Sequence, residues 1–214
     1  MPNLSAAIFD IGGVLTVSPV QRIIAFCREH GIPDDVRHQV FAPHDGLWAR
    51  FERSELSPEE FAAYFDRAIR PTGTTATGAG FMQWFFQGFE PRPEMIAVVE
   101  HLRGKVRLGS ITNNVARDEP PQMRTAGLDI HGLFDVIIES SIVGIRKPDP
   151  RIYQMACEHL GVEPHEAVFL DDLGVNLKAA RALGMTTIKV DESHRAIDEL
   201  EEALGIPLPR LQPQ

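Results

Sequence analysis

The side chains best suited to chemistry stand just after short apolar runs, in four separate parts of the sequence. They are an aspartate, a threonine–asparagine pair, a lysine and an acidic pair, namely Asp10, Thr112 with Asn113, Lys147, and Asp171 with Asp172. Each has an ordinary explanation when taken alone, because Asp, Thr and Asn commonly form turns or cap helices after strands. Acidic residues also suit a helix N-terminus. Their joint position after apolar runs is what suggests a single site.

If these residues met at one place, they would suit phosphoryl transfer. Three carboxylates repel one another unless a cation holds them, and oxygen donors without His or Cys favour Mg²⁺. Thr112, Asn113 and the ammonium of Lys147 would then bind the remaining oxygens of a phosphoryl group. Asp10, beside the metal, would attack phosphorus and form an aspartyl-phosphate.

The apolar runs themselves predict the strands that position this site. They cover residues 4–9, 106–111, 134–138, 167–170 and 186–190. Helical patterns separate the later runs, over 120–127, 150–161 and 176–184, and each of them stops at a glycine. Strands that alternate with helices predict an α/β fold with a doubly wound parallel sheet. In such sheets ligands bind at the carboxyl ends of the strands.

A long segment with helical patterning separates the first two predicted strands. It contains a capping box at Ser57-Pro58-Glu59-Glu60, which predicts a helix start. The sequence therefore predicts a core formed by residues 1–16 and 105–214, with a small α-helical cap inserted over 17–104. A cap placed after the first strand would lie over the strand ends.

The four segments resemble the motifs of the haloacid dehalogenase-like (HAD) superfamily with a small helical cap. They read "FDIGGVLT", "SITNN", "GIRKPDP" and "VFLDDLGVNLKAA", in that order along the chain. The resemblance spans about residues 5–190 and implies a Rossmann-like core and an Mg²⁺-dependent hydrolase, most often a phosphatase.

The resemblance also implies a role for each motif residue. Asp10 would be the nucleophile and a metal ligand, and the backbone carbonyl of Gly12 a second ligand. Asp172 would bind Mg²⁺ directly and Asp171 through water. Thr112, Asn113 and Lys147 would bind the phosphoryl group. Asn176 would either brace the acidic loop or serve only as a polar residue in a first helical turn.

Gly12 departs from the family pattern, in which most phosphatases have an aspartate that protonates the leaving alcohol. Glycine keeps the backbone ligand but transfers no proton, and such general acid–base assistance is typically worth roughly 10²–10⁴-fold in rate. Three readings stay open: a phosphatase that uses another proton source, a low-turnover regulatory module, or a hydrolytic dehalogenase. His44 and Asp45 are candidate proton sources.

The alternatives make different predictions. A phosphatase without this acid would favour aryl, anomeric sugar or acyl phosphates, whose leaving groups need little protonation. A Gly12→Asp substitution would then raise turnover of alkyl phosphates more than that of aryl phosphates. A dehalogenase needs no acidic pair, so Asp171 and Asp172 argue against it.

Composition bounds the partners and the compartment. A formal net charge of -9 disfavours nucleic-acid and anionic-membrane surfaces, which repel an acidic protein. The expected partner is a small phosphorylated molecule. Cys27 and Cys157 lie far apart and have no metal-binding spacing, which is typical of reduced thiols. With no apolar leader or membrane-spanning run, the expected location is the cytoplasm. Oligomeric state is not predicted.

Overall fold

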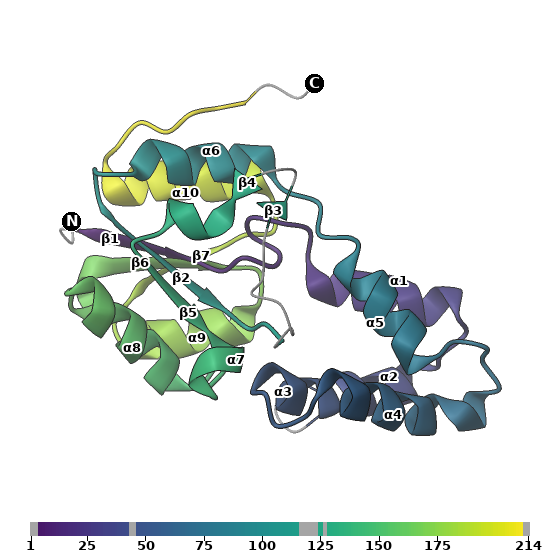
Figure 1. Cartoon of the computed structure of the whole chain (residues 1–214). Helices are drawn as coiled ribbons and strands as arrows, with labels where there is room; N and C mark the ends of the chain where they lie inside the picture. The colour runs from purple at the N-terminus through teal and green to yellow at the C-terminus, as the bar shows by residue number, and fades with distance from the viewer. Residues whose placement is uncertain (1–3, 43–45, 116–123, 126–127, 212–214) are drawn as a thin grey trace.

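The fold is built on a five-stranded parallel sheet, which lies between two groups of helices in Figure 1. The computed structural model describes residues 4–42, 46–115, 124–125 and 128–211. The strands of the sheet are β1 (Ala6–Phe9), β2 (Arg107–Thr112), β5 (Val136–Glu139), β6 (Ala167–Asp171) and β7 (Thr186–Lys189). All five predicted strands are confirmed, and the α/β class with them.

The strand order is β5-β2-β1-β6-β7, so the chain winds outward from β1 in both directions. In register, Phe9 of β1 lies opposite Ser110 of β2 and Leu170 of β6. The residues that follow these positions therefore emerge at the same edge of the sheet. This is the point at which the strand order reverses, where ligands bind in open α/β sheets.

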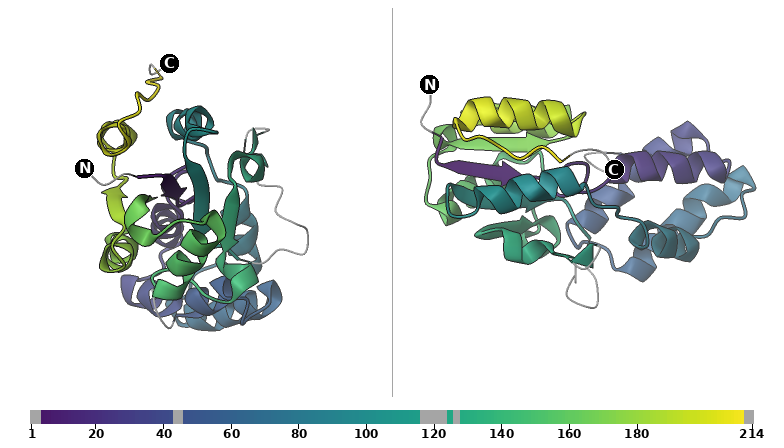
Figure 2. Two further views of the ribbon diagram at one scale, coloured as in Figure 1. Left: turned by 90° about the vertical axis from the view of Figure 1, so that its left-hand side faces the viewer. Right: turned by 90° about the horizontal axis from the view of Figure 1, so that it is seen from above.

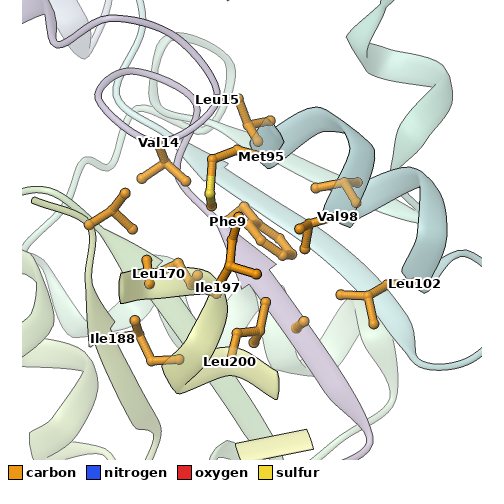
Figure 3. Packing of buried hydrophobic residues seen from close by; sticks show 14 of the residues in the cluster. Phe9, Val14, Leu15, Met95, Val98, Leu102, Leu170, Ile188, Ile197 and Leu200 are labelled. Atoms are coloured by element: carbon orange, nitrogen blue, oxygen red, sulfur yellow. The ribbon is translucent and has the colours of Figure 1, made fainter. Parts of the chain in front are cut away.

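Side chains alternate across β1 and feed two hydrophobic cores. Ala7 and Phe9 pack on one side, with α6 (Pro93–Leu102) and α10 (Ser193–Leu204), and Figure 3 shows Met95 and Ile197 around Phe9. Ala6 and Ile8 pack on the other side, with α8 (Pro150–Leu160) and α9 (Gly174–Ala182). The result is a three-layer sandwich, whose two helical layers are also separated in Figure 2.

The segment after β1 forms a helical unit beside the sheet rather than on either of its faces (Figure 1). Its helices are α1 (Pro19–Glu29), α2 (Asp34–Phe41), α3 (Leu47–Glu52), α4 (Pro58–Ile69) and α5 (Gly78–Phe86). They share an aromatic core around Phe61, Phe65 and Phe81. The predicted capping box is present, because Ser57 and Glu60 satisfy each other's backbone N–H groups at the start of α4.

Helix α6 lies within the range expected for the inserted cap, residues 17–104, but packs with the core. Met95, Val98 and Leu102 are buried against β1 and α10. The expected range is therefore too long at its C-terminal end, and the helical cap ends before Pro93. Core helices and cap helices both have an apolar face, so the apolar pattern of α6 does not indicate which of the two units the helix joins.

The helix expected over 120–127 falls mostly on residues outside the described ranges. Where the chain is described, Arg124–Thr125 (β3) and Leu128–Asp129 (β4) pair as a short antiparallel ladder, so the helix prediction is wrong there. Among the described residues, no helix is both long and apolar enough to cross a lipid bilayer.

The chain passes from the core into the cap after β1 and returns before α6. Cap and core also contact each other at a place away from these connections. It lies between the end of α3 and the start of α7 (Ser140–Val143). The hydroxyl of Ser140 donates to the carbonyl of Glu52 at 2.7 Å, and that of Ser54 donates to the carbonyl of Ser141 at 2.7 Å. Arg146 also pairs with Glu52, with an N–O distance of 2.7 Å. The cap is thus held over the strand ends on two sides.

Candidate active site

Asp10 stands at the carboxyl end of the central strand. Its backbone N–H still donates to Leu170 of β6, so the strand fixes where its side chain begins. The carboxylate is buried, and one oxygen accepts a hydrogen bond from the N–H of Ile11 at 2.7 Å. The second oxygen meets the ammonium of Lys147 at 2.8 Å. Both oxygens are therefore held in a fixed orientation.

Lys147 links Asp10 to the acidic pair. Its fully buried ammonium lies 2.8 Å from Asp10, 2.8 Å from Asp171 and 2.8 Å from the carbonyl of Ile111. Burial alone would lower the pKa of Lys147, but the charges of Asp10 and Asp171 outweigh it and raise that pKa. The lysine thus stays protonated and is a permanent positive charge at the sheet edge.

Asn113 positions the lysine through the backbone. Its side-chain carbonyl accepts from the N–H of Lys147 at 2.8 Å, and its amide donates to the carbonyl of the same residue at 3.1 Å. Both ends of the Asn113 side chain are engaged in this way. The side chain of Asn113 thus positions Lys147, and its expected contact with a phosphoryl group stays a prediction.

Asp171 ends β6 and is completely buried. Besides Lys147, its carboxylate accepts from the N–H of Leu173 at 2.8 Å and from the amide of Asn176, 3.0 Å from each oxygen. Asn176 is buried on the first turn of α9. Of its two readings, the bracing of the acidic loop is thus the one confirmed.

Asp172 is less enclosed and accepts a hydrogen bond from the hydroxyl of Ser18 at 2.7 Å. Ser18 precedes α1 in the position of a helix cap, yet makes no capping hydrogen bond. Sequence reasoning missed this contact, because a Ser-Pro pair normally indicates only a helix start. Gly13, with φ +84°, approaches Asp172 so closely that a Cβ there would collide with the carboxylate.

The three carboxylates fit a hard divalent cation. Asp10, Asp171 and Asp172 each offer an oxygen, and these atoms all lie within 4.8 Å of one another. Burial raises the pKa of Asp10 well above its usual range, opposed by Lys147 and reinforced by Asp171 and Asp172. Burial also raises the pKa of Asp172. One lysine against two buried carboxylates and one partly buried carboxylate leaves negative charge that a cation would offset.

The four predicted segments lie along one cavity of about 590 Å³ between the core and the cap. Asp10, Gly12, Thr112, Lys147 and Asp172 all line it. Asp171 does not, which agrees with its complete burial. Thr112 is the last residue of β2 and is buried in the same lining as Asp10. His44 and Asp45 lie outside the described residues.

Sequence and structure comparisons place the chain among known proteins. The haloacid dehalogenase-like hydrolase family matches residues 4–184, and the chain belongs to this family. Acyl-CoA dehydrogenase family member 10 of Mus musculus is 36% identical over 95% of this chain, but the match covers 19% of that protein. Bifunctional epoxide hydrolase 2 of Sus scrofa is 31% identical over 96% of this chain and 40% of its own length. The chain thus spans less than half of these two relatives.

Two further proteins match over nearly their whole length. Phosphatase MT3486 of Mycobacterium tuberculosis is 35% identical, over 92% of this chain and 91% of its own. The structure of a HAD-like family hydrolase from Porphyromonas gingivalis superposes with a TM-score of 0.74 at 24% identity, over 94% of this chain and 98% of its own. The protein is therefore a HAD-like hydrolase with a Rossmann-like core.

Proposed function

We propose that this protein is a Mg²⁺-dependent phosphatase that hydrolyses a small phosphate monoester through an aspartyl-phosphate on Asp10. One observation carries the proposal: the carboxylate of Asp10 contacts Lys147 at 2.8 Å, in a cavity that also contains Asp172. The name of the relative from Mycobacterium tuberculosis, a phosphatase, supports the same reaction class.

In the first step Asp10 attacks phosphorus, an Asp–O–P bond forms and the bond to the leaving oxygen breaks. The N–H of Ile11 and the ammonium of Lys147 hold the carboxylate, so little reorganisation is needed before attack. Thr112 offers a hydroxyl from the lining of the same cavity. Lys147 also offsets the negative charge that a phosphate brings to Asp10.

In the second step water attacks the phosphorus of the aspartyl-phosphate, and inorganic phosphate and free Asp10 are released. The leaving alkoxide takes its proton from water in the first step, since Gly12 supplies none. This favours leaving groups that are stable as anions, such as aryl oxides.

Asp10, the backbone carbonyl of Gly12 and Asp172 would hold the Mg²⁺, with Asp171 acting through water. When bound, the cation would neutralise the carboxylates and the phosphoryl oxygens together. Asp171 has a second role in this chain, because its ion pair with Lys147 keeps the ammonium directed at Asp10.

The test is Mg²⁺-dependent release of phosphate from an aryl phosphate. Wild-type protein should release phosphate, Asp10→Asn should abolish release, and Asp198→Asn, at an exposed aspartate of α10, should leave it unchanged. Release that survives Asp10→Asn would contradict the nucleophile. Tight binding of phosphate without turnover of any ester would instead favour a regulatory module, and Mg²⁺-independent release of halide from a haloacid would favour a dehalogenase.

A further inference from the structure

The cavity has two chemically different sides. The side formed by the core carries Asp10, Thr112, Lys147 and Asp172, the polar groups of the phosphoryl site. The side formed by the cap is largely apolar and aromatic, and includes Val20, Trp48, Phe85, Phe86 and Phe89. Both sides line the same cavity, so a substrate with its phosphate beside Asp10 extends its organic group toward the aromatic side.

The aromatic side is packed and pre-formed. The ring centroids of Phe85 and Trp48 lie 4.8 Å apart, and those of Phe85 and Phe89 lie 5.1 Å apart in an edge-to-face arrangement. The indole N–H of Trp48 is already used, because it donates to Glu52 at 2.8 Å. These rings therefore offer carbon surface rather than hydrogen-bonding groups to a ligand.

Among the residues that the structure describes, the charged side chains on the cap side of this cavity are already paired or exposed to solvent. Arg37 pairs with Asp34 at 2.9 Å, and Glu52 pairs with Arg146 at 2.7 Å. Gln87 and Glu90 are exposed. A sugar or another polyol placed here would lose hydrogen bonds to water without gaining equivalent partners from the described residues of the cap. An apolar group would bury carbon against carbon.

Val20 gives independent support. It lines the cavity next to Pro19, on the first turn of α1. It is nevertheless 39% exposed, and few large apolar residues in the described part of the chain are exposed to that extent. A ligand that filled the cavity would cover this side chain, and the free energy of that burial would add to affinity.

From this partition we infer that the organic group of the substrate is a large alkyl or aryl group, bound against the aromatic side of the cap. The inference rests on the proposed phosphatase function and specifies its substrate class: phosphate monoesters with a large apolar organic group, among which aryl esters have the better leaving groups. The volume of about 590 Å³ lies within the range of small-molecule sites and exceeds what a phosphate alone needs.

The experiment measures dissociation constants of methyl-, butyl- and octylphosphonate with the Mg²⁺-loaded protein, by calorimetry below the micellar concentration, with inorganic phosphate as competitor. Each methylene buried in the cavity tightens binding up to about fourfold. We expect the Kd of octylphosphonate to lie at least about tenfold below that of butylphosphonate. Equal constants for the two, or tighter binding of glycerol phosphate than of octylphosphonate, would overturn the inference.

Two variants locate the apolar contact. Phe89→Ala and Val20→Ser should each reduce the ratio of butyl- to octylphosphonate Kd about threefold or more. Ile142→Ala, which removes an apolar side chain that is 75% exposed on α7 outside the cavity lining, is the matched control and should leave the ratio unchanged. A ratio that neither cavity variant alters would place the alkyl chain elsewhere and overturn the inference.

Phosphonates are not hydrolysed, so this test is independent of turnover. If the protein releases phosphate from aryl phosphates but its Kd for alkylphosphonates does not depend on chain length, only the substrate class is contradicted. Chain-length dependence without phosphate release from any ester would contradict the phosphatase function and support the apolar ligand site.

Discussion

The ring of Pro19 occupies the space that a side chain at residue 12 would need. A Cβ built on Gly12 would stand 2.6 Å from Cγ and 2.8 Å from Cδ of Pro19, far inside van der Waals contact. Pro19 is the first residue of α1, so its ring is fixed by the start of that helix. The missing aspartate is therefore coupled to the way in which the cap begins.

This contact changes the expected result of restoring the acid. Gly12→Asp alone should destabilise the protein by about 1–3 kcal/mol, because the ring of Pro19 or the loop must move. Its turnover of alkyl phosphates should not rise.

Gly12→Asp combined with Pro19→Ala removes both colliding atoms and should raise alkyl turnover more than aryl turnover. Thermal unfolding and steady-state kinetics check this, with Pro19→Ala as reference. Higher alkyl turnover in Gly12→Asp alone, at unchanged stability, would show that the site accommodates the side chain.

Lys147 and Lys189 form ion pairs of the same length, one of them buried and the other exposed, so their contributions to stability can be compared. Each ammonium lies 2.8 Å from a carboxylate, but Lys147 is fully buried, whereas Lys189 and its partner Asp191 are exposed. Lys147→Met leaves two buried carboxylates without their counter-charge and should lower the free energy of unfolding by about 3–5 kcal/mol. Lys189→Met should lower it by less than about 1 kcal/mol. Urea denaturation with EDTA present measures both, and equal losses would argue against a charged Asp10–Lys147–Asp171 cluster.

Mg²⁺ should stabilise the folded protein even without substrate. A cation bound only by the folded state adds about 2.7 kcal/mol at a concentration one hundred times its Kd. Asp172→Asn should remove this gain, and in EDTA the variant should be at least as stable as the wild type, because one of three repelling carboxylates is gone. Asp191→Asn, at an exposed position, should retain the gain. Differential scanning calorimetry with Mg²⁺ or EDTA checks it; a gain that persists in Asp172→Asn would place the cation elsewhere.

Much of the fold follows from local pattern. The five strands were predictable because buried parallel strands are continuous apolar runs, and α4 because Ser57 and Glu60 form a capping box. The grouping of Asp10, Thr112 and the acidic pair followed from the rule that parallel strands end at one edge, and Lys147 joins them from the loop between α7 and α8. The C-terminal limit of the cap did not follow, since the apolar face of α6 does not reveal which core it joins.

Other contacts between distant residues were not predictable. Ser18 contacts Asp172 and Pro19 fills the space beside Gly12 only because the first helix of the cap starts at the site. Glu52 pairs with Arg146 across the boundary between cap and core, and nothing in the local pattern of either residue indicates the other. The hydrogen bonds between the Asn113 side chain and the backbone of Lys147 were not predictable either, because they depend on the loop conformation.

The two cysteines can report whether cap and core open separately. Cys27 lies in the aromatic core of the cap and Cys157 in the core beneath the sheet; both are free and buried, and burial raises the pKa of each thiol to about 11. Local opening exposes a unit without global unfolding, and the cap has a single hydrophobic core, whereas the α/β unit has one on each side of its sheet. In low urea at pH 8, a maleimide reagent should therefore label Cys27 faster than Cys157, as followed by mass spectrometry on Cys27→Ala and Cys157→Ala proteins of matched stability. Identical labelling rates that track global unfolding would mean that the contacts of Glu52 with Ser140 and Arg146 join cap and core into one cooperative unit.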